Sequence, residues 1–392
     1  MSKRMILMHV PYFLLLSAAA FLGGCQMVPI NGDDSRNSVG YVTPRTMMFR
    51  DVKLRNGSTL PEVTVAYQVH GHLNAAGTNA ILVMHGNTAN YHVAGRYAPG
   101  ASPPGIPAES PGWWSDLIGP GKAMDTVHYF VVSSAMLGGS WGTTGPRSIK
   151  PGTGKPYGPD FPEISLEDVV AVQHEFLTRL GVRHLVAVAG GSYGGALAFQ
   201  WGITYPDMME GLVIASISPT GGKNPQAIKR ITDRLARDPN WNGGRYYDQP
   251  GGMVNTLMEI RVDTLNAYGL DKELAATIPD PAARAAEIRK RAEPWAQAFD
   301  ANSLVVQRKL SEFRDHTRDF QRIKAKVLYV LSTTDSLVPP SLAPKVMADL
   351  KAAGVDATYF ELVSDQGHSA YTRDATRWAP ALRDFLSRLS VP

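Results

Sequence analysis

The chain has little of several features that would point directly to a function class. Its 392 residues contain one cysteine, Cys25, so no intramolecular disulfide can form. No group of His, Cys, Asp and Glu residues has the spacing of metal ligands, and His70 with His72 are too few to bind a metal alone. No repeat of about 20–50 residues is visible, which argues against a solenoid or a propeller. We therefore expect no metal site and no cofactor.

The chain also lacks a concentrated charge of either sign. It has 39 Lys and Arg residues against 35 Asp and Glu residues, and the formal net charge is +4. The basic residues are spread along the chain, whereas nucleic-acid-binding proteins usually gather them on a stripe or a helix. The sequence therefore predicts no nucleic-acid partner. A hydrophobic fraction of 44% is that of a folded protein, and the length allows one large domain or two ordinary ones.

An apolar run long enough to cross a bilayer as a helix, about 20 residues, is also missing from the amino-terminal region. Lys3 and Arg4 precede a shorter apolar run at residues 11–22, which Gly23 and Gly24 follow. A basic start, a run of about a dozen apolar residues and small residues before a cleavage point are typical of an export signal. Residues 1–25 are therefore predicted to be a signal peptide.

The end of this signal, Leu-Gly-Gly-Cys, resembles the bacterial lipobox. The resemblance implies that Cys25 is lipidated and anchors the mature protein to the periplasmic face of a membrane. Gln26, rather than Asp, after the cysteine favours an outer-membrane lipoprotein. A plain cleaved signal and an uncleaved anchor stay open as alternatives. Residues 26–45 are polar and are predicted to form a tether.

Beyond residue 45, short β-branched runs alternate with longer amphipathic stretches, a pattern that predicts a mostly parallel sheet with helical crossovers. A helix is predicted over 166–180, because its apolar residues share one face. The strand rhythm stops between residues 218 and 321, where helical patterns predict a lid over the carboxyl edge of the sheet. The sheet domain would then comprise residues 46–217 and 322–392. Strands are predicted at residues 63–69, 80–84, 129–133, 185–189, 212–215, 327–331 and 358–362.

The strongest motif is Gly-Gly-Ser-Tyr-Gly-Gly at residues 190–195. It follows a predicted strand and precedes a helix-like segment, which is the context that the G-x-S-x-G nucleophile elbow requires. The turn is so tight that the residues flanking the serine must lack side chains. A phosphate-binding loop fits poorly, since the Lys-Ser/Thr ending and the GxGxxG pattern are absent. We therefore predict that Ser192 is a catalytic nucleophile.

A serine hydroxyl needs a base within hydrogen-bond reach and an acid that orients the base. In this arrangement the acid and then the histidine follow the serine in the chain. His368 lies on a glycine-containing loop after the last predicted strand and is the expected base. Asp335 follows the predicted strand 327–331 and is the expected acid. Asp365 is the rival, but it lies only three residues from His368 on the same loop.

The oxyanion hole is expected to combine two backbone N–H groups. One belongs to Tyr193, the residue after the nucleophile. The other comes from the loop after the predicted strand 80–84, where Asn87 is the expected donor and Thr88 the alternative. His85, at the start of this loop, is expected to be structural rather than a base.

Longer motifs are more specific than the triad pattern, and they occur in order between about residues 79 and 368. They begin with Pro-Gly-Trp-Trp-Ser-Asp at 111–116 and continue in the segments 137–146, 154–162, 190–195, 238–244 and 299–303. With these motifs the sequence resembles the homoserine O-acetyltransferase family. The resemblance implies an α/β-hydrolase fold, that is, an α/β architecture with a mostly parallel central sheet and a helical lid insertion.

The family's nucleophile, acid and base fall on Ser192, Asp335 and His368. Membership implies a ping-pong reaction in which an acyl-thioester acylates the serine and a hydroxyl then takes the acyl group. The implied partner is a small ester or thioester, no cofactor is implied, and a homodimer is an open alternative.

Two departures from the family set the predicted function. Counting back from Asp238, the arginine that grips the amino-acid carboxylate in this family would fall near Thr232, with Arg230 and Arg234 on either side. The chain is therefore expected to lack this contact, and the export signal would separate it from cytoplasmic acyl-CoA. The predicted function is an exported esterase or acyl hydrolase. The alternative is an O-acyltransferase acting on homoserine or another alcohol, and an inactive binding protein is disfavoured by the complete triad.

Overall fold

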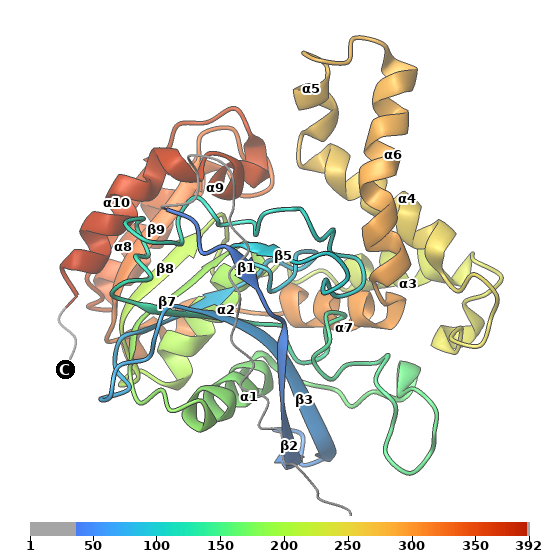
Figure 1. Cartoon of the computed structure of the whole chain (residues 1–392), viewed down its shortest axis with the longest axis horizontal. Helices are drawn as coiled ribbons and strands as arrows, with labels where there is room; N and C mark the ends of the chain where they lie inside the picture. Colours follow the sequence, from blue (N-terminus) through green and yellow to red (C-terminus); the bar gives the residue numbers. More distant parts are fainter. Residues whose placement is uncertain (1–36, 390–392) are drawn as a thin grey trace, which may run out of the picture. The chain divides into compact units, whose positions relative to one another are not determined.

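The structure is a computed structural model that describes residues 37–389 (Figure 1). The predicted signal peptide, including Cys25, lies outside the described residues. In the part that is described, no helix combines the length and the apolar character that a membrane span requires.

A central eight-stranded sheet carries the fold, with the strand order β10-β9-β8-β7-β4-β6-β3-β2. β3 runs antiparallel to both of its neighbours, whereas every other neighbouring pair is parallel. The predicted mostly parallel sheet is thus confirmed. The strands are β2 (Arg45–Lys53), β3 (Thr59–His70), β4 (Ala80–Met84), β6 (Phe130–Ser134), β7 (Leu185–Gly191), β8 (Met209–Ala215), β9 (Lys326–Ser332) and β10 (Ala357–Leu362).

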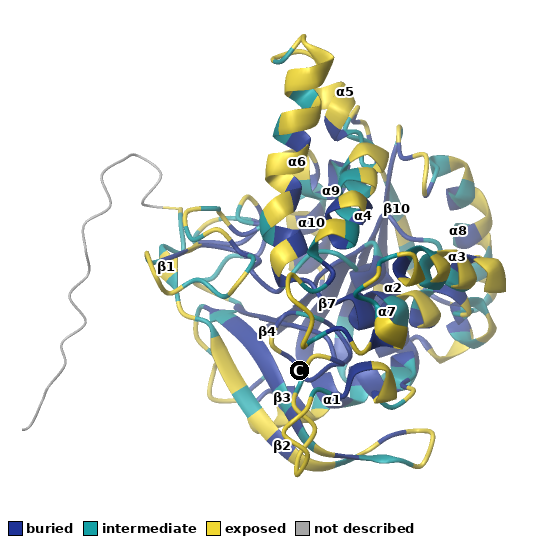
Figure 2. Ribbon diagram, turned by 90° about the vertical axis from the view of Figure 1, so that its right-hand side faces the viewer, coloured by how far each residue is buried: buried dark blue, intermediate teal, exposed yellow. Residues whose placement is uncertain are grey.

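Helices cover both faces of this sheet. α1 (Leu166–Arg179), α2 (Tyr193–Thr204) and α8 (Ala343–Ala352) pack on one face, where Leu82 and Met84 of β4 join their apolar cluster. α10 (Ala375–Ser387) packs on the other face, where its buried residues share an apolar cluster with Ile81 and Val83. Because β4 is covered on both sides, it is an uninterrupted apolar run. Figure 2 shows β4 and β7 buried inside the molecule, helices with exposed outer faces around them, and β2 largely exposed at the sheet edge.

Helix α1 illustrates how the sequence sets its own boundaries. Ser165 caps its first turn by accepting a hydrogen bond from the Asp168 N–H, and the Asp168 carboxylate accepts one from the Ser165 N–H. This reciprocal pair is a capping box. The buried face of α1 includes Val169, Phe176 and Leu177, in agreement with the predicted periodicity.

Residues 218–321, called the helical insertion below, contain no strand of the described structure and form five α-helices. Figure 1 shows α5 and one end of α6 extending away from the sheet. Trp295 and Phe299 of the insertion belong to an apolar cluster that also includes Tyr97 and Trp141 of the sheet domain. Its helices are α3 (Pro225–Ala236), α4 (Val254–Ala267), α5 (Leu270–Leu274), α6 (Pro281–Ala298) and α7 (Ala301–Glu312).

The polar tether predicted over residues 26–45 is wrong at its carboxyl end. β1 (Tyr41–Val42) pairs with β5 (Arg96–Tyr97), and the first residue of β2 is Arg45. Val39 and Val42 pack against apolar clusters of the core. These aliphatic side chains gain more from burial than a solvated tether would offer, so the folded unit starts earlier than expected.

Candidate active site

Ser192 lies at a sharp turn between the end of β7 and the start of α2. Its backbone φ is 54° and its ψ is −125°, a conformation that L-residues rarely adopt. A Cβ on Gly190 would collide with the backbone of Gly194, and one on Gly194 would collide with the Met84 carbonyl. The turn therefore needs these glycines, and it presents the Ser192 hydroxyl at the carboxyl edge of the sheet.

The structure brings together the three residues predicted to form the triad. His368 Nε2 lies 3.0 Å from Ser192 Oγ, and His368 Nδ1 lies 2.8 Å from Asp335 Oδ2. Asp335 follows β9, and His368 lies on the short 3-10 helix after β10, so all three residues come from loops at one sheet edge. Asp335 Oδ1 accepts hydrogen bonds from the N–H groups of Leu337 and Val338. These donors fix the orientation of the carboxylate.

The rival carboxylate, Asp365, does not reach the base. It is exposed, and its Oδ1 accepts a hydrogen bond of 2.8 Å from Gln366 Nε2. In this arrangement Asp365 cannot fix the orientation of the His368 ring.

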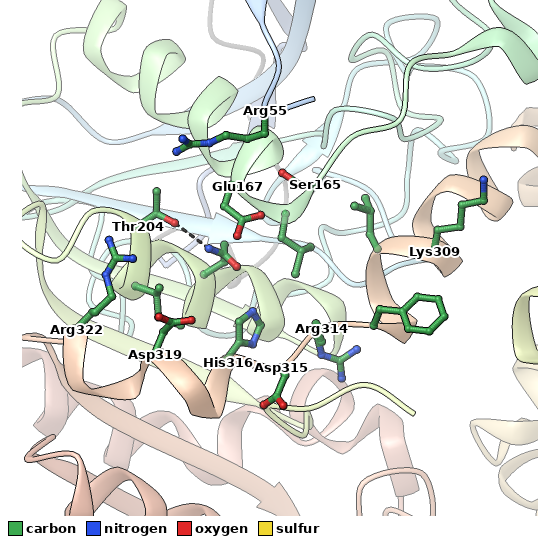
Figure 3. Close-up of a pocket in the computed structure, with 15 residues that line it drawn as sticks. Arg55, Ser165, Glu167, Thr204, Lys309, Arg314, Asp315, His316, Asp319 and Arg322 are labelled. Carbon is green, nitrogen blue, oxygen red and sulfur yellow. Dashed lines mark hydrogen bonds between the residues drawn. The ribbon is translucent and has the colours of Figure 1, made fainter. Parts of the chain in front are cut away.

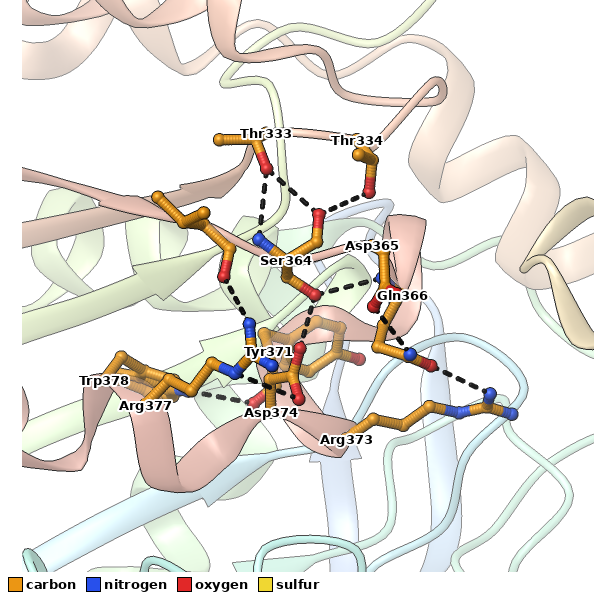
Figure 4. Close-up of polar contacts among 11 residues, drawn as sticks. Thr333, Thr334, Ser364, Asp365, Gln366, Tyr371, Arg373, Asp374, Arg377 and Trp378 are labelled. Atoms are coloured by element: carbon orange, nitrogen blue, oxygen red, sulfur yellow. Dashed lines mark hydrogen bonds and ion pairs between the residues drawn. The ribbon is translucent and has the colours of Figure 1, made fainter. Parts of the chain in front are cut away.

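The loop that carries His368 is tied to the loop that carries Asp335 (Figure 4). The carbonyl of Ser364 accepts hydrogen bonds from the hydroxyls of Thr333, at 3.0 Å, and Thr334, at 2.8 Å. The Thr334 hydroxyl in turn accepts one from the Gly367 N–H, and the Ser364 hydroxyl donates one to Asp374. This network fixes the distance between acid and base without touching either side chain.

The predicted oxyanion hole residues also lie beside the nucleophile. Asn87 and Thr88 line the same cavity as Ser192, and Tyr193 is the first residue of α2. Within residues 37–389 no hydrogen bond uses the N–H group of Asn87 or Tyr193, so both are available for an oxyanion. His85 is buried, its Nδ1 contacts the Gly86 carbonyl, and burial lowers its pKa to about 4. These features fit the structural role expected for His85.

The helical insertion contributes side chains that sequence reasoning missed. Arg261 on α4 and Tyr268 directly after it line the cavity of Ser192, and the Tyr268 ring lies 5.3 Å from the His368 ring. Arg261 Nη1 donates to the Thr88 hydroxyl, and Trp295 Nε1 donates to the Thr88 carbonyl. The insertion thus holds the loop that carries the candidate oxyanion donor.

The loss of the family's carboxylate-binding arginine near Thr232 stays a prediction, but Arg261 places a guanidinium in the cavity of Ser192. Arg230 is exposed, Arg234 pairs with Asp263, and Thr232 lines a different cavity. The position obtained by counting back from Asp238 lies in α3, whereas the guanidinium in this cavity belongs to Arg261 of α4. A charged residue between Ile260 and Val262, on a helix that buries Leu257 and Ile260, was the available sign.

The electrostatics of the cavity suit an anionic ligand. It has a volume of about 150 Å3, and no carboxylate side chain lines it. Burial lowers the pKa of Arg261, but a guanidinium remains charged at neutral pH. Its Nε has no hydrogen-bond partner within residues 37–389, and its guanidinium stacks 5.2 Å from the Trp295 ring centre. A buried N–H without a partner is costly, so a ligand carboxylate would be a favourable partner.

Nothing in the described part of the chain offers a metal centre, since no three His, Cys, Asp or Glu side chains there lie together in a ligating arrangement.

Comparison with known proteins places this geometry in a family. Residues 79–374 match the family model for the alpha/beta hydrolase fold. The chain is 37% identical over 363 residues to a homoserine O-acetyltransferase of Symbiobacterium thermophilum, covering 86% of this chain and 92% of that protein. The chain belongs to the homoserine O-acetyltransferase family. The chain is also 33% identical to a homoserine O-acetyltransferase of Carboxydothermus hydrogenoformans, and the match covers 89% of this chain and 96% of that protein.

Solved structures related to this family agree with the fold. The homoserine O-acetyltransferase from Bacillus anthracis superposes with a TM-score of 0.78 at 28% identity, covering 90% of this chain and all of its own. The esterase E22 superposes with a TM-score of 0.77 at 29% identity, covering 88% of this chain and all of its own. The predicted α/β-hydrolase fold is confirmed, and the chain is a serine enzyme of the acyltransferase and esterase type.

Proposed function

We propose that this protein is an O-acyltransferase that moves an acyl group from a thioester to the hydroxyl of a carboxylate-bearing alcohol of the homoserine class. The observation that carries the proposal is Arg261, a cation in the Ser192 cavity whose Nε has no partner within the described residues. A hydrolase acting on a neutral ester has no need of a buried guanidinium there. The similarity to curated homoserine O-acetyltransferases supports the same acceptor class.

The first half-reaction acylates Ser192. His368 Nε2 takes the hydroxyl proton as the Ser192 oxygen attacks the thioester carbonyl, and the N–H groups of Asn87 and Tyr193 stabilise the oxyanion. When the intermediate collapses, the carbon–sulfur bond breaks and the imidazolium returns its proton to the leaving thiolate. Asp335 holds the ring in the required tautomer throughout.

The second half-reaction repeats these steps with the acceptor. Arg261 binds the acceptor carboxylate, which places the hydroxyl against the acyl carbonyl. His368 removes the hydroxyl proton, the oxygen attacks, and the Ser192–acyl bond breaks as the serine oxygen recovers a proton. Positioning matters because water competes for the same acyl-enzyme, and a bound alcohol gains a large proximity advantage over it.

Ester hydrolysis is the second candidate, in which water replaces the alcohol. It is favoured by the likeness to the esterase E22 and by the amino-terminal sequence, which predicts export away from acyl-CoA. The two functions share every step until the acyl-enzyme meets its acceptor.

Arg261→Met is expected to raise KM for homoserine by about 10–150-fold, because a hydrogen bond to a charged group contributes about 1.5–3 kcal/mol. Hydrolysis of p-nitrophenyl acetate should change much less. Arg261→Lys is the matched control, since it keeps the charge and should retain part of the affinity. The assay follows free thiol, free acid and O-acetylhomoserine, with and without homoserine. If the rate of thiol release does not depend on homoserine and the only acyl product is free acid, the acyltransferase function is refuted and the esterase function is supported.

For the amino terminus we propose that Cys25 is lipidated and anchors the enzyme at the periplasmic face of the outer membrane. The support is the lipobox-like Leu-Gly-Gly-Cys. Cys25→Ser should release the protein from the membrane fraction or block its processing, because serine lacks the thiol that would carry the lipid anchor. Fractionation with acyl-chain labelling checks this result. A wild-type protein found in the cytoplasm would overturn the location and place the enzyme with acyl-CoA. The homodimer stays a prediction.

A further inference from the structure

A second cavity lies away from the catalytic one, between α1, the end of α2 and the segment after α7 (Figure 3). It has a volume of about 410 Å3 and shares no lining residue with the cavity of Ser192. This volume is within the usual range of small-molecule sites, about 300–1,000 Å3.

Five of the charged side chains that line this cavity, of both signs, form no ion pair within the described residues. Arg55, Lys309 and Arg322 are exposed, whereas Glu167 and Asp319 are partly buried. None of the five forms an ion pair with another residue of the described part of the chain. In contrast, Asp315 at the same cavity pairs with Lys223 at 2.6 Å. Glu167 and Asp319 are thus more buried than these three cations. Arg314 also lines the cavity and is partly buried, but its guanidinium donates to the carbonyls of Ser218, Thr220 and Ser311.

His316 provides an independent sign of a ligand. Only 3% of this residue is exposed, and within residues 37–389 neither ring nitrogen has a hydrogen-bond partner. Burial, reinforced by the nearby Arg314, lowers the pKa of His316 to about 3, so the ring is neutral at physiological pH. A neutral imidazole keeps one nitrogen as an acceptor. Figure 3 shows Glu167 and Asp319 extending from opposite walls toward the space beside His316.

We propose that this cavity binds a small zwitterion, such as an amino acid or a dipeptide, with its ammonium group inward and its carboxylate outward. Glu167, Asp319 and the acceptor nitrogen of His316 would receive the ammonium protons. The guanidinium groups of Arg55 and Arg322 suit a carboxylate at the rim, since Arg binds carboxylates through two parallel hydrogen bonds. A dianionic ligand would be repelled by Glu167 and Asp319, and a dicationic ligand would be repelled by Arg55 and Arg322. Both kinds of ligand are therefore disfavoured.

The cavity is connected to the nucleophile by one helix. α2 has its first residue next to Ser192, and Gln200 and Thr204 of its last turns line this cavity. The proposal concerns binding, which does not depend on the reaction assigned above.

Titration calorimetry on the full chain, with glycylglycine as the probe, tests the proposal. Two blocked analogues serve as matched controls: N-acetylglycylglycine lacks the ammonium group, and glycylglycinamide lacks the carboxylate. Saturable 1:1 binding of glycylglycine is expected, with each blocked analogue at least tenfold weaker. Equal binding of all three, or no saturable binding, would overturn the proposal.

Variants assign the binding to this cavity. Glu167→Gln and Asp319→Asn should each weaken glycylglycine binding about tenfold or more, as expected for a lost hydrogen bond to a charged group. Asp207→Asn, which removes an exposed carboxylate paired with Lys324 elsewhere on the surface, should leave it unchanged. Hydrolysis of p-nitrophenyl acetate reports whether each variant is folded. Binding that is lost in Arg261→Met but kept in Glu167→Gln would place the dipeptide in the catalytic cavity and refute the second site.

Discussion

Ser192→Ala is expected to lower kcat by roughly 10⁶-fold and to abolish labelling by a serine-directed fluorophosphonate. The hydroxyl of Ser192 lies 3.0 Å from His368 Nε2 and can carry an acyl group. Without it no covalent intermediate forms, and only the oxyanion donors and substrate binding accelerate the reaction, leaving roughly 10³–10⁴-fold over water. Thiol release from acetyl-CoA and ester hydrolysis should fall together, because both reactions pass through the same acyl-enzyme.

The matched control is Ser387→Ala, which removes an exposed hydroxyl at the end of α10 that donates to the Asp384 carbonyl. This variant should keep full activity and labelling. Labelling of Ser192→Ala at the level of the original enzyme would show that another residue is the nucleophile. Circular dichroism should be unchanged, since a glycine-flanked elbow tolerates the loss of one oxygen atom.

The strands and the triad could be predicted from the sequence because each depends on a short local pattern of residues. β4 and β7 are buried over their whole length, so burial on both faces appears as an uninterrupted apolar run. Ser192 follows β7 and Asp335 follows β9, which is buried except for its first residue, whereas His368 follows the partly exposed β10. Parallel strands bring their carboxyl ends to one edge. Their sequence separations are large, but their order along the chain was sufficient to identify them.

The missed features depend on tertiary packing. β2 is an edge strand whose residues are mostly exposed, with only Phe49 buried, so it has no clear apolar pattern. Arg261 reaches the catalytic cavity only because α4 packs over the loop that carries Thr88. No local pattern encodes that approach, and counting residues from a neighbouring motif pointed to α3 instead. The guanidinium of Arg261 in this cavity supports acyl transfer to a carboxylate-bearing alcohol, whereas the sequence alone predicts hydrolysis.

The second large effect is expected from Asp335→Asn, which should lower kcat by up to roughly 10⁴-fold while the fold stays intact. The amide oxygen of asparagine can still accept hydrogen bonds from Leu337 and Val338, so the loop should keep its shape. The amide nitrogen would then face His368 Nδ1, where the carboxylate now accepts at 2.8 Å. An N–H donor at that position favours the tautomer that carries its proton on Nε2, and such a ring cannot accept the Ser192 proton.

Asp365→Asn is the matched comparison, because it makes the same chemical change three residues from His368. Asp365 is exposed and bonded to Gln366, so this variant should change kcat less than about twofold. Steady-state kinetics of both variants between about pH 6 and about pH 9 separate a tautomer defect from a simple pKa shift. A tautomer defect persists across the range, because no change of pH turns the amide nitrogen into an acceptor for the Nδ1 proton, whereas a shifted pKa would be recovered at higher pH. Loss of activity in Asp365→Asn with normal activity in Asp335→Asn would assign the orienting carboxylate to residue 365 and contradict the geometry of the triad.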